Sequence, residues 1–298
     1  YDAQNDYNNA FIAYRNAFNV YENYYTEYFG IDAPLQLKKD LLRTAKLTGL
    51  DSEYDFYKRK FNFEWDRDEN SGKGSLVFLW HNGMGPIKDE QSINFTIIEG
   101  DNGSWVFFND EYGLSFPVYV GGGNNDNSSD FSDLQFIRMA LPKYIQRPPL
   151  FTSASIEAGG ETYELELAED INAIALKVLQ DRMLRELGNA LIRLATKKSA
   201  ELALREENED AGAALGIINA LTEQADIRNW TSLPFSIHYT RAYLSPETEE
   251  ITLNVSGNEA KSEFTIPVKI KAGRTTFQTF RSLETRSSGQ YIDDFWLN

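Results

Sequence analysis

The spacing of hydrophobic residues changes along this 298-residue chain, and these changes constrain its fold more than any other feature. Before residue 63, apolar and aromatic residues recur in steps of three and four, which is the period of an α-helix. The first such stripe comprises Ala10, Tyr14, Phe18, Tyr21, Tyr25 and Tyr28. From Gly74 the pattern alternates with a period of two, which indicates β-strands. We therefore expect a helical amino-terminal part followed by a β-sheet.

The period changes again near residue 168. Candidate strands occupy residues 76–80, 93–98, 105–108, 114–120 and 163–167. A long apolar stripe from Leu176 to Leu194 then predicts a helix, and the small residues at 211–220 predict a second one. Strands resume at residues 235–243, 250–255, 263–270 and 275–280. This order predicts an α+β fold and not a doubly wound one.

The same pattern predicts the organisation of the chain. We expect a helical region at residues 1–63 and an antiparallel β-sheet or sandwich domain at residues 74–298. A long helical hairpin at about 168–226 interrupts that domain. Local signals indicate where the helices begin and end. Asn5 or Asp6 can cap the first helix, Asp32, Asp51 and Asp170 can cap later ones, and Gly30 and Gly49 are candidate ends.

The composition excludes several classes of function. The net charge of −16 argues against nucleic acid, whose phosphates need a basic face. The chain has no cysteine, so it has neither disulfides nor thiolate metal sites, and its two histidines leave little for an imidazole cage. No apolar run approaches the roughly 18 residues that would span a bilayer. We expect no cofactor and no metal site.

The first helix carries a finer pattern. Asp6 and Tyr7, followed by Ala10, Tyr14 and Ala17, resemble the second helix of a tetratricopeptide repeat, in which small alanines let a partner helix approach. That partner would precede Tyr1, so the chain is expected to begin inside a repeat. The alternative is an ordinary helical hairpin. The dense aromatic residues of this region either pack against the β domain or form a peptide- or glycan-binding face.

Two short segments carry the candidate site residues. The first, Trp80–Glu90, follows an apolar strand and holds two glycines, Pro86 and His81, which predicts a strand, a tight turn and a strand. His81 is either a general acid–base or, more simply, a polar residue of the turn. The second segment, Asp226–Pro234, follows the helical stretch. We expect the two segments to pack together, with Arg228 paired to a carboxylate and Trp230 filling the core.

These segments resemble an uncharacterised bacterial family of tetratricopeptide-containing envelope lipoproteins. Asn82, Gly83, Pro86, Lys88 and Glu90 match an Asn-Gly-x-x-Pro-x-Lys-x-Glu pattern. Residues 225–234, which include Asp226, Arg228 and Trp230, match an Ala-Asp-x-Arg-x-Trp-x-x-Leu-Pro pattern. The resemblance implies an exported, non-enzymatic protein that envelope proteins bind. It also implies a membrane tether through a lipidated amino-terminal cysteine, which these residues lack, and a part in cell-wall or outer-membrane assembly.

Three functions follow from this reading. The leading expectation is a non-catalytic scaffold of the bacterial cell envelope, either periplasmic or an outer-membrane lipoprotein. The alternative is a carbohydrate- or peptidoglycan-binding module, because tyrosine and tryptophan rings stack on sugar faces. A hydrolase that uses acidic pairs such as Glu164 and Glu166 ranks last, since 45 acidic residues produce such pairs by chance. No nucleophile elbow or phosphate-binding loop is present, so no catalytic residue is expected.

Overall fold

The computed structural model describes residues 1–65, 70–99, 104–111, 113–119, 136–207 and 226–286. The chain forms two compact units. Unit 1 comprises residues 1–86, 146–175 and 230–289, and unit 2 comprises residues 87–145, 176–229 and 290–298. This division differs from the expected boundary near residues 63–74, because the amino-terminal helices pack into the same unit as most of the strands. The chain passes between the units five times.

The amino-terminal helices follow the local signals closely. They are η1 (Asp2–Gln4), α1 (Tyr7–Val20), a π-helical turn η2 (Tyr21–Tyr25), α2 (Thr26–Phe29), α3 (Leu35–Thr48) and α4 (Asp51–Phe61). Asp6 caps α1 by accepting a hydrogen bond from Asn9 N, and Gly30 and Gly49 take the left-handed conformation at helix ends. Asp51 is the first residue of α4 and not its N-cap, which is Leu50. Asp32 does not cap α3. That helix begins after Pro34, and the Glu166 carboxylate accepts from its first free amides.

Unit 1 contains two four-stranded sheets. The first sheet has the order β12-β1-β9-β8, formed by β12 (Thr275–Ser282), β1 (Gly74–Asn82), β9 (Ser236–Leu244) and β8 (Glu166–Asp170). The second has the order β11-β10-β6-β7, formed by β11 (Lys261–Pro267), β10 (Glu250–Ser256), β6 (Ser153–Ala158) and β7 (Glu161–Glu164). Neighbouring strands are antiparallel except β1 and β12, which are parallel. Apart from this one parallel pair, the sheets are antiparallel, as expected.

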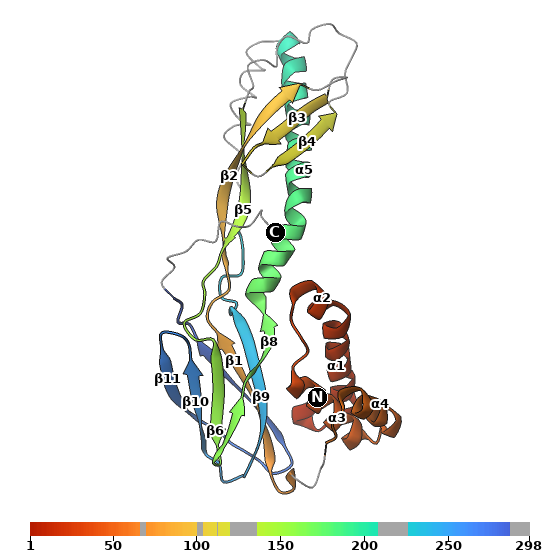
Figure 1. The fold of residues 1–298 in the computed structure, drawn as a ribbon, viewed down its shortest axis with the longest axis vertical. Helices are drawn as coiled ribbons and strands as arrows, with labels where there is room; N and C mark the ends of the chain where they lie inside the picture. The colour runs from red at the N-terminus through yellow and green to blue at the C-terminus, as the bar shows by residue number, and fades with distance from the viewer. Residues whose placement is uncertain (66–69, 100–103, 112, 120–135, 208–225, 287–298) are drawn as a thin grey trace. The chain divides into compact units, whose positions relative to one another are not determined.

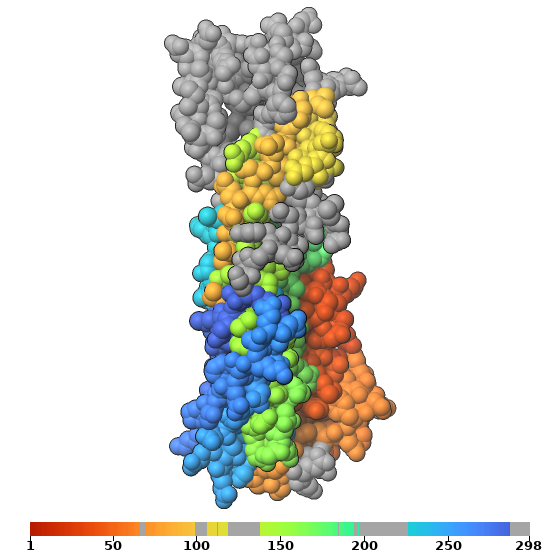
Figure 2. Space-filling model, turned by 60° about the vertical axis from the view of Figure 1, so that its left-hand side comes forward, coloured from red at the N-terminus to blue at the C-terminus, as the bar shows by residue number. Residues whose placement is uncertain are grey.

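The two sheets of unit 1 form a sandwich, with side chains from both in one core. The core includes Leu76, Phe78 and Trp80 of β1, Ile156 of β6, and Leu253 and Val255 of β10. Figure 2 shows the second sheet from outside, with β10 and β11 in blue beside β6 in green. Side chains alternate between the two faces of a strand. Half of the side chains of β1 and β9 therefore point into this core, and the others point to the opposite face of the first sheet.

The amino-terminal helices cover that opposite face (Figure 1). Their core cluster of Phe11, Phe18, Leu41, Leu42 and Ala45 has Tyr239 of β9 packed against it. The Tyr21 hydroxyl donates to the carbonyl of Ala168, and the Tyr25 hydroxyl donates to Glu169 Oε1 at 3.1 Å. Most of the amino-terminal aromatic residues therefore pack within unit 1, as the simpler interpretation expected, whereas Tyr24 is 66% exposed.

Unit 2 is a sheet covered by a helix. The sheet has the order β4-β3-β2-β5, formed by β4 (Leu114–Tyr119), β3 (Ser104–Asn109), β2 (Ile87–Glu99) and β5 (Phe136–Ile145). The helix α5 (Ile171–Glu207) is capped by Asp170, which accepts from Ala173 N at 2.8 Å. Its residues Leu179, Met183, Leu187 and Leu191 pack on Ile93, Phe95, Phe107, Met139 and Leu141.

The α+β class, with amino-terminal helices followed by largely antiparallel sheets and interrupted by a long helix, is confirmed. The helix expected at residues 211–220 lies outside the described residues, so the second arm of the hairpin stays a prediction. Within the described part of the chain, every helix is too short or too polar to span a bilayer.

Candidate functional site

The predicted turn forms a tightly bonded junction at the end of β1. Asn82 is 1% exposed, and its Nδ2 donates to the carbonyl of Phe151 at 2.8 Å. Its own carbonyl accepts from Phe235 N at 2.9 Å. Gly85 N donates to the carbonyl of Leu233 at 2.7 Å. The expected packing of the two segments is therefore confirmed for residues 82–86 and 233–235, which both lie in unit 1.

Close backbone approach explains the two glycines of this turn. Gly83 has a φ of +63°, and a Cβ placed there would lie 2.9 Å from Cβ of Pro149. A Cβ at Gly85 would lie 3.2 Å from the carbonyl oxygen of Pro234. Larger side chains would force these segments apart, so the glycines serve the packing of the backbone.

Arg147 ties the turn to the second segment. Its Nε donates to the carbonyl of Gly85 at 2.7 Å, and its Nη2 donates to the carbonyl of Thr231 at 2.9 Å. Asn172 adds a further link, because its backbone N donates to the carbonyl of Phe235 and its side chain donates to Gln146 Oε1. Burial lowers the pKa of Arg147. Four of the five segments that cross between the units are thus bonded to one another inside unit 1.

The remaining residues of the first motif lie on strands. His81 lies inside β1, opposite Arg281 and Ile237, and not in the turn as expected. Burial, aided by the charge of Arg281, lowers the pKa of His81. Pro86 is buried in unit 1. Lys88 and Glu90 lie on β2 of unit 2, where the Lys88 ammonium is 6.0 Å from the centre of the Tyr144 ring.

The second motif is displayed outward. Trp230 is 72% exposed, so the expectation that it fills the core was wrong. Its Nε1 donates to Ser232 Oγ at 2.6 Å. Arg228 pairs with Asp226, Nε to Oδ1 at 2.9 Å, in unit 2, and both side chains are exposed. Hydrogen bonds from Arg228 lower the pKa of Asp226, with a smaller contribution from the charge of Lys88.

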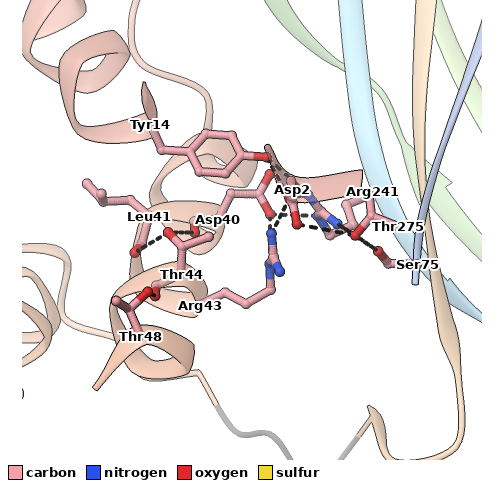
Figure 3. A network of polar contacts seen from close by, with 10 residues as sticks. All are labelled: Asp2, Tyr14, Asp40, Leu41, Arg43, Thr44, Thr48, Ser75, Arg241 and Thr275. Atoms are coloured by element: carbon pink, nitrogen blue, oxygen red, sulfur yellow. Dashed lines mark hydrogen bonds and ion pairs between the residues drawn. The ribbon is translucent and has the colours of Figure 1, made fainter. Parts of the chain in front are cut away.

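A second candidate region is a buried ion cluster between the amino-terminal helices and the first sheet (Figure 3). It contains two carboxylates, Asp2 and Asp40, and two guanidinium groups, Arg43 and Arg241. Arg241 Nη2 lies 2.6 Å from Asp2 Oδ2, and its Nε lies 2.6 Å from Asp40 Oδ1. Arg43 also pairs with Asp2. Hydroxyl groups complete the cluster, from Tyr14, Ser75 and Thr275.

Asp2 and Arg241 are held in their ionised forms. Burial raises the pKa of Asp2, but Arg241 and Arg43 lower it by more, so the net pKa lies below the usual 3.8. Burial alone would lower the pKa of Arg241, but Asp40, Tyr14 and Asp2 outweigh that effect, so the net pKa of Arg241 is raised. Groups that stay ionised and out of solvent suit the joining of η1, α3 and β9, and do not suit proton transfer at neutral pH.

Next to this cluster lies a cleft of about 660 Å³ within unit 1. Its buried residues are Gln36, Asp40, Thr240 and Arg241. Half-buried aromatic rings line it, from Phe63, Trp65, Tyr163 and Tyr243. Its exposed lining residues include Leu35, Lys39, Glu64, Thr162 and Glu164. Glu164 and Glu166, the weak acidic pair of the sequence, both line it, but Glu166 is engaged at the start of α3.

Sequence reasoning missed Arg147 and the ion cluster. Arg241 carried a usable signal, because it is a charged residue inside an alternating, otherwise apolar and aromatic strand, and such a residue needs a buried counter-ion. Asp2, Asp40 and Arg43 carried none, since charged residues on amphipathic helices usually face solvent. Arg147 lies in an irregular segment where residue type says little about contacts.

Comparisons with protein-family models, with curated proteins and with solved structures found no match to this chain.

Proposed function

We propose that this chain is a non-catalytic interaction protein of the bacterial cell envelope, which binds a partner protein through Trp230. The observation that carries the proposal is the exposure of a large aromatic side chain on an ordered backbone. Tryptophan is the side chain most enriched among residues that dominate binding energy in protein interfaces. The envelope location and the link to wall or outer-membrane assembly rest on the resemblance of the two motifs.

Hydrogen bonds hold the backbone at Trp230 and in the three residues after it. The carbonyl of Thr231 accepts from Arg147, and Leu233 N donates to the carbonyl of Trp230 at 3.4 Å. The carbonyl of Ser232 accepts from Arg281 of β12. A side chain that is already held in place loses less conformational freedom on binding, which favours affinity.

Photo-crosslinking in the native bacterium tests this function. Trp230 is replaced by p-benzoylphenylalanine in the full-length protein, and Tyr24 is replaced in the same way as a control of similar exposure in the same unit. We expect one discrete protein adduct from position 230 in the envelope fraction and none from position 24. The partner is then purified, and Trp230→Ala should weaken its binding about 30-fold or more, whereas Tyr24→Ala should not.

The outcomes separate the proposal from its alternatives. Identical adducts from both positions, or undiminished binding of the purified partner to Trp230→Ala, would refute a binding role for Trp230. Recovery of the protein in the cytoplasmic fraction would refute the envelope location. The proposed tetratricopeptide character and lipid tether are tested by the full-length precursor, which should carry an export signal with a lipidation cysteine and further helical repeats.

A further inference from the structure

We propose that the cleft beside Asp40 binds a neutral oligosaccharide of hexose or N-acetylhexosamine units. This inference goes beyond the binding of a protein through Trp230 and does not depend on it. It rests on three features of unit 1: an unsatisfied buried carboxylate oxygen, aromatic walls, and an acidic rim.

One carboxylate oxygen of Asp40, a residue that lines the cleft, lacks a hydrogen-bond donor. Asp40 is 1% exposed, and its Oδ1 lies 2.6 Å from Arg241 Nε. Its Oδ2 is also buried and accepts no hydrogen bond within the described part of the chain. A buried carboxylate oxygen without a donor is costly. A hydroxyl group of a bound ligand would supply the missing donor.

The aromatic walls of the cleft suit the apolar face of a sugar ring. A pyranose presents an apolar face of C–H groups and a polar edge of hydroxyl groups. The half-buried rings of Trp65 and Tyr163 offer surface for the apolar face. Gln36 and Glu164, in the lining of the same cleft, carry groups that hydrogen-bond hydroxyls. Aromatic rings with a few polar groups make up an ordinary small-ligand site.

Charge narrows the choice of saccharide. The cleft lining holds four carboxylates, from Asp40, Glu64, Glu164 and Glu166, against two cations, from Lys39 and Arg241. Like charges repel an acidic sugar in such a site. A neutral chain avoids that repulsion and still donates hydrogen bonds to the carboxylates.

Titration calorimetry with chitotetraose tests the inference, with its de-N-acetylated, cationic counterpart as a second probe. The unmodified chain should bind chitotetraose saturably in 0.5 M NaCl. Glu164→Ala should weaken binding about tenfold or more, because it removes a charged acceptor at an exposed position. Glu263→Ala, at an exposed position of β11 outside the cleft, should leave binding unchanged.

Asp40→Asn should abolish binding if the variant folds, as judged by circular dichroism, and Glu164→Ala carries the test if it does not. Three results would overturn the inference: no binding of chitotetraose, equal losses for Glu164→Ala and Glu263→Ala, or binding of the cationic tetramer alone that 0.5 M NaCl removes. The last result would show simple attraction to an acidic chain. Trp230→Ala, which removes the partner protein, should leave saccharide binding unchanged. Either proposal can therefore fail without the other.

Discussion

Replacement of Arg241 by Met should destabilise unit 1 strongly. Arg241 is buried and contacts both carboxylates of the ion cluster, Asp2 and Asp40, at 2.6 Å. Met fills a similar length without charge, so the variant leaves two buried carboxylates against the single charge of Arg43. Removal of one partner from a buried pair costs about 3–5 kcal/mol. Since a domain is stable by about 5–15 kcal/mol, this is a large part of the total.

A second substitution distinguishes charge from packing. Arg241→Met combined with Asp40→Asn restores equal numbers of positive and negative groups. If uncompensated charge causes the loss, the double variant should be more stable than Arg241→Met alone. If lost contacts cause it, the second substitution should add a further loss. The sign of this difference decides between the two causes.

Hydrogen exchange measured by mass spectrometry suits a chain with two units, because a single unfolding transition is not assured. Peptides from β1 and β9 report on unit 1, and peptides from β2 and β5 report on unit 2. We expect faster exchange in β1 and β9 only. A loss below about 1 kcal/mol in those strands would refute the view that the cluster joins the helices to the sheet.

Two further predictions concern unit 1. His238 is packed against Trp80, and burial lowers its pKa from 6.5 to about 4. The unfolded chain therefore takes up the proton first as pH falls, so stability present above pH 6.5 is lost toward pH 4, by about 2 kcal/mol between pH 7 and 4.5. His238→Gln should flatten that decline in urea unfolding, and an unchanged decline would contradict the assignment. Gly83→Ala should cost about 2 kcal/mol or more, whereas Gly159→Ala, at a similar φ of +61° with open space around it, should cost about 1 kcal/mol; equal losses in thermal unfolding would contradict the role of close packing at Gly83.

Local signals in the sequence predicted local structure well. The cap at Asp6, the helix ends at Gly30 and Gly49, and the span of α4 need only a few neighbouring residues, so a single sequence contains the information. The apolar stripe of α5 was also predicted, because a helical face that packs on a sheet must be apolar along its length.

Most contacts between distant segments were not predicted, and the packing of residues 82–86 on residues 233–235 is the exception. The parallel pairing of β1 with β12 joins residues about 200 positions apart, and no local pattern specifies which strand lies beside which. The capping of α3 by Glu166 was not predicted, for the same reason. Asp32 is a common capping residue type and lies next to the helix, so the sequence suggested it instead. For the candidate site, the sequence suggested that Trp230 is buried and that His81 lies in a turn. Tertiary contacts instead leave Trp230 exposed and place His81 in β1.

The two sequence motifs now separate into parts with different physical roles. Gly83, Gly85 and Pro234 allow backbone segments to approach closely, and any sequence that keeps this junction needs small or rigid residues there. Trp230 is under no such constraint, because its ring contributes little buried area to unit 1. A large aromatic residue that the fold does not require is therefore better explained by binding than by folding. The consequence is measurable: Gly83→Ala should lower stability, and Trp230→Ala should leave the thermal unfolding of unit 1 within about 0.5 kcal/mol of its original value while it removes the partner. A substantial loss of stability in Trp230→Ala would return this residue to the structural role that its sequence context first suggested.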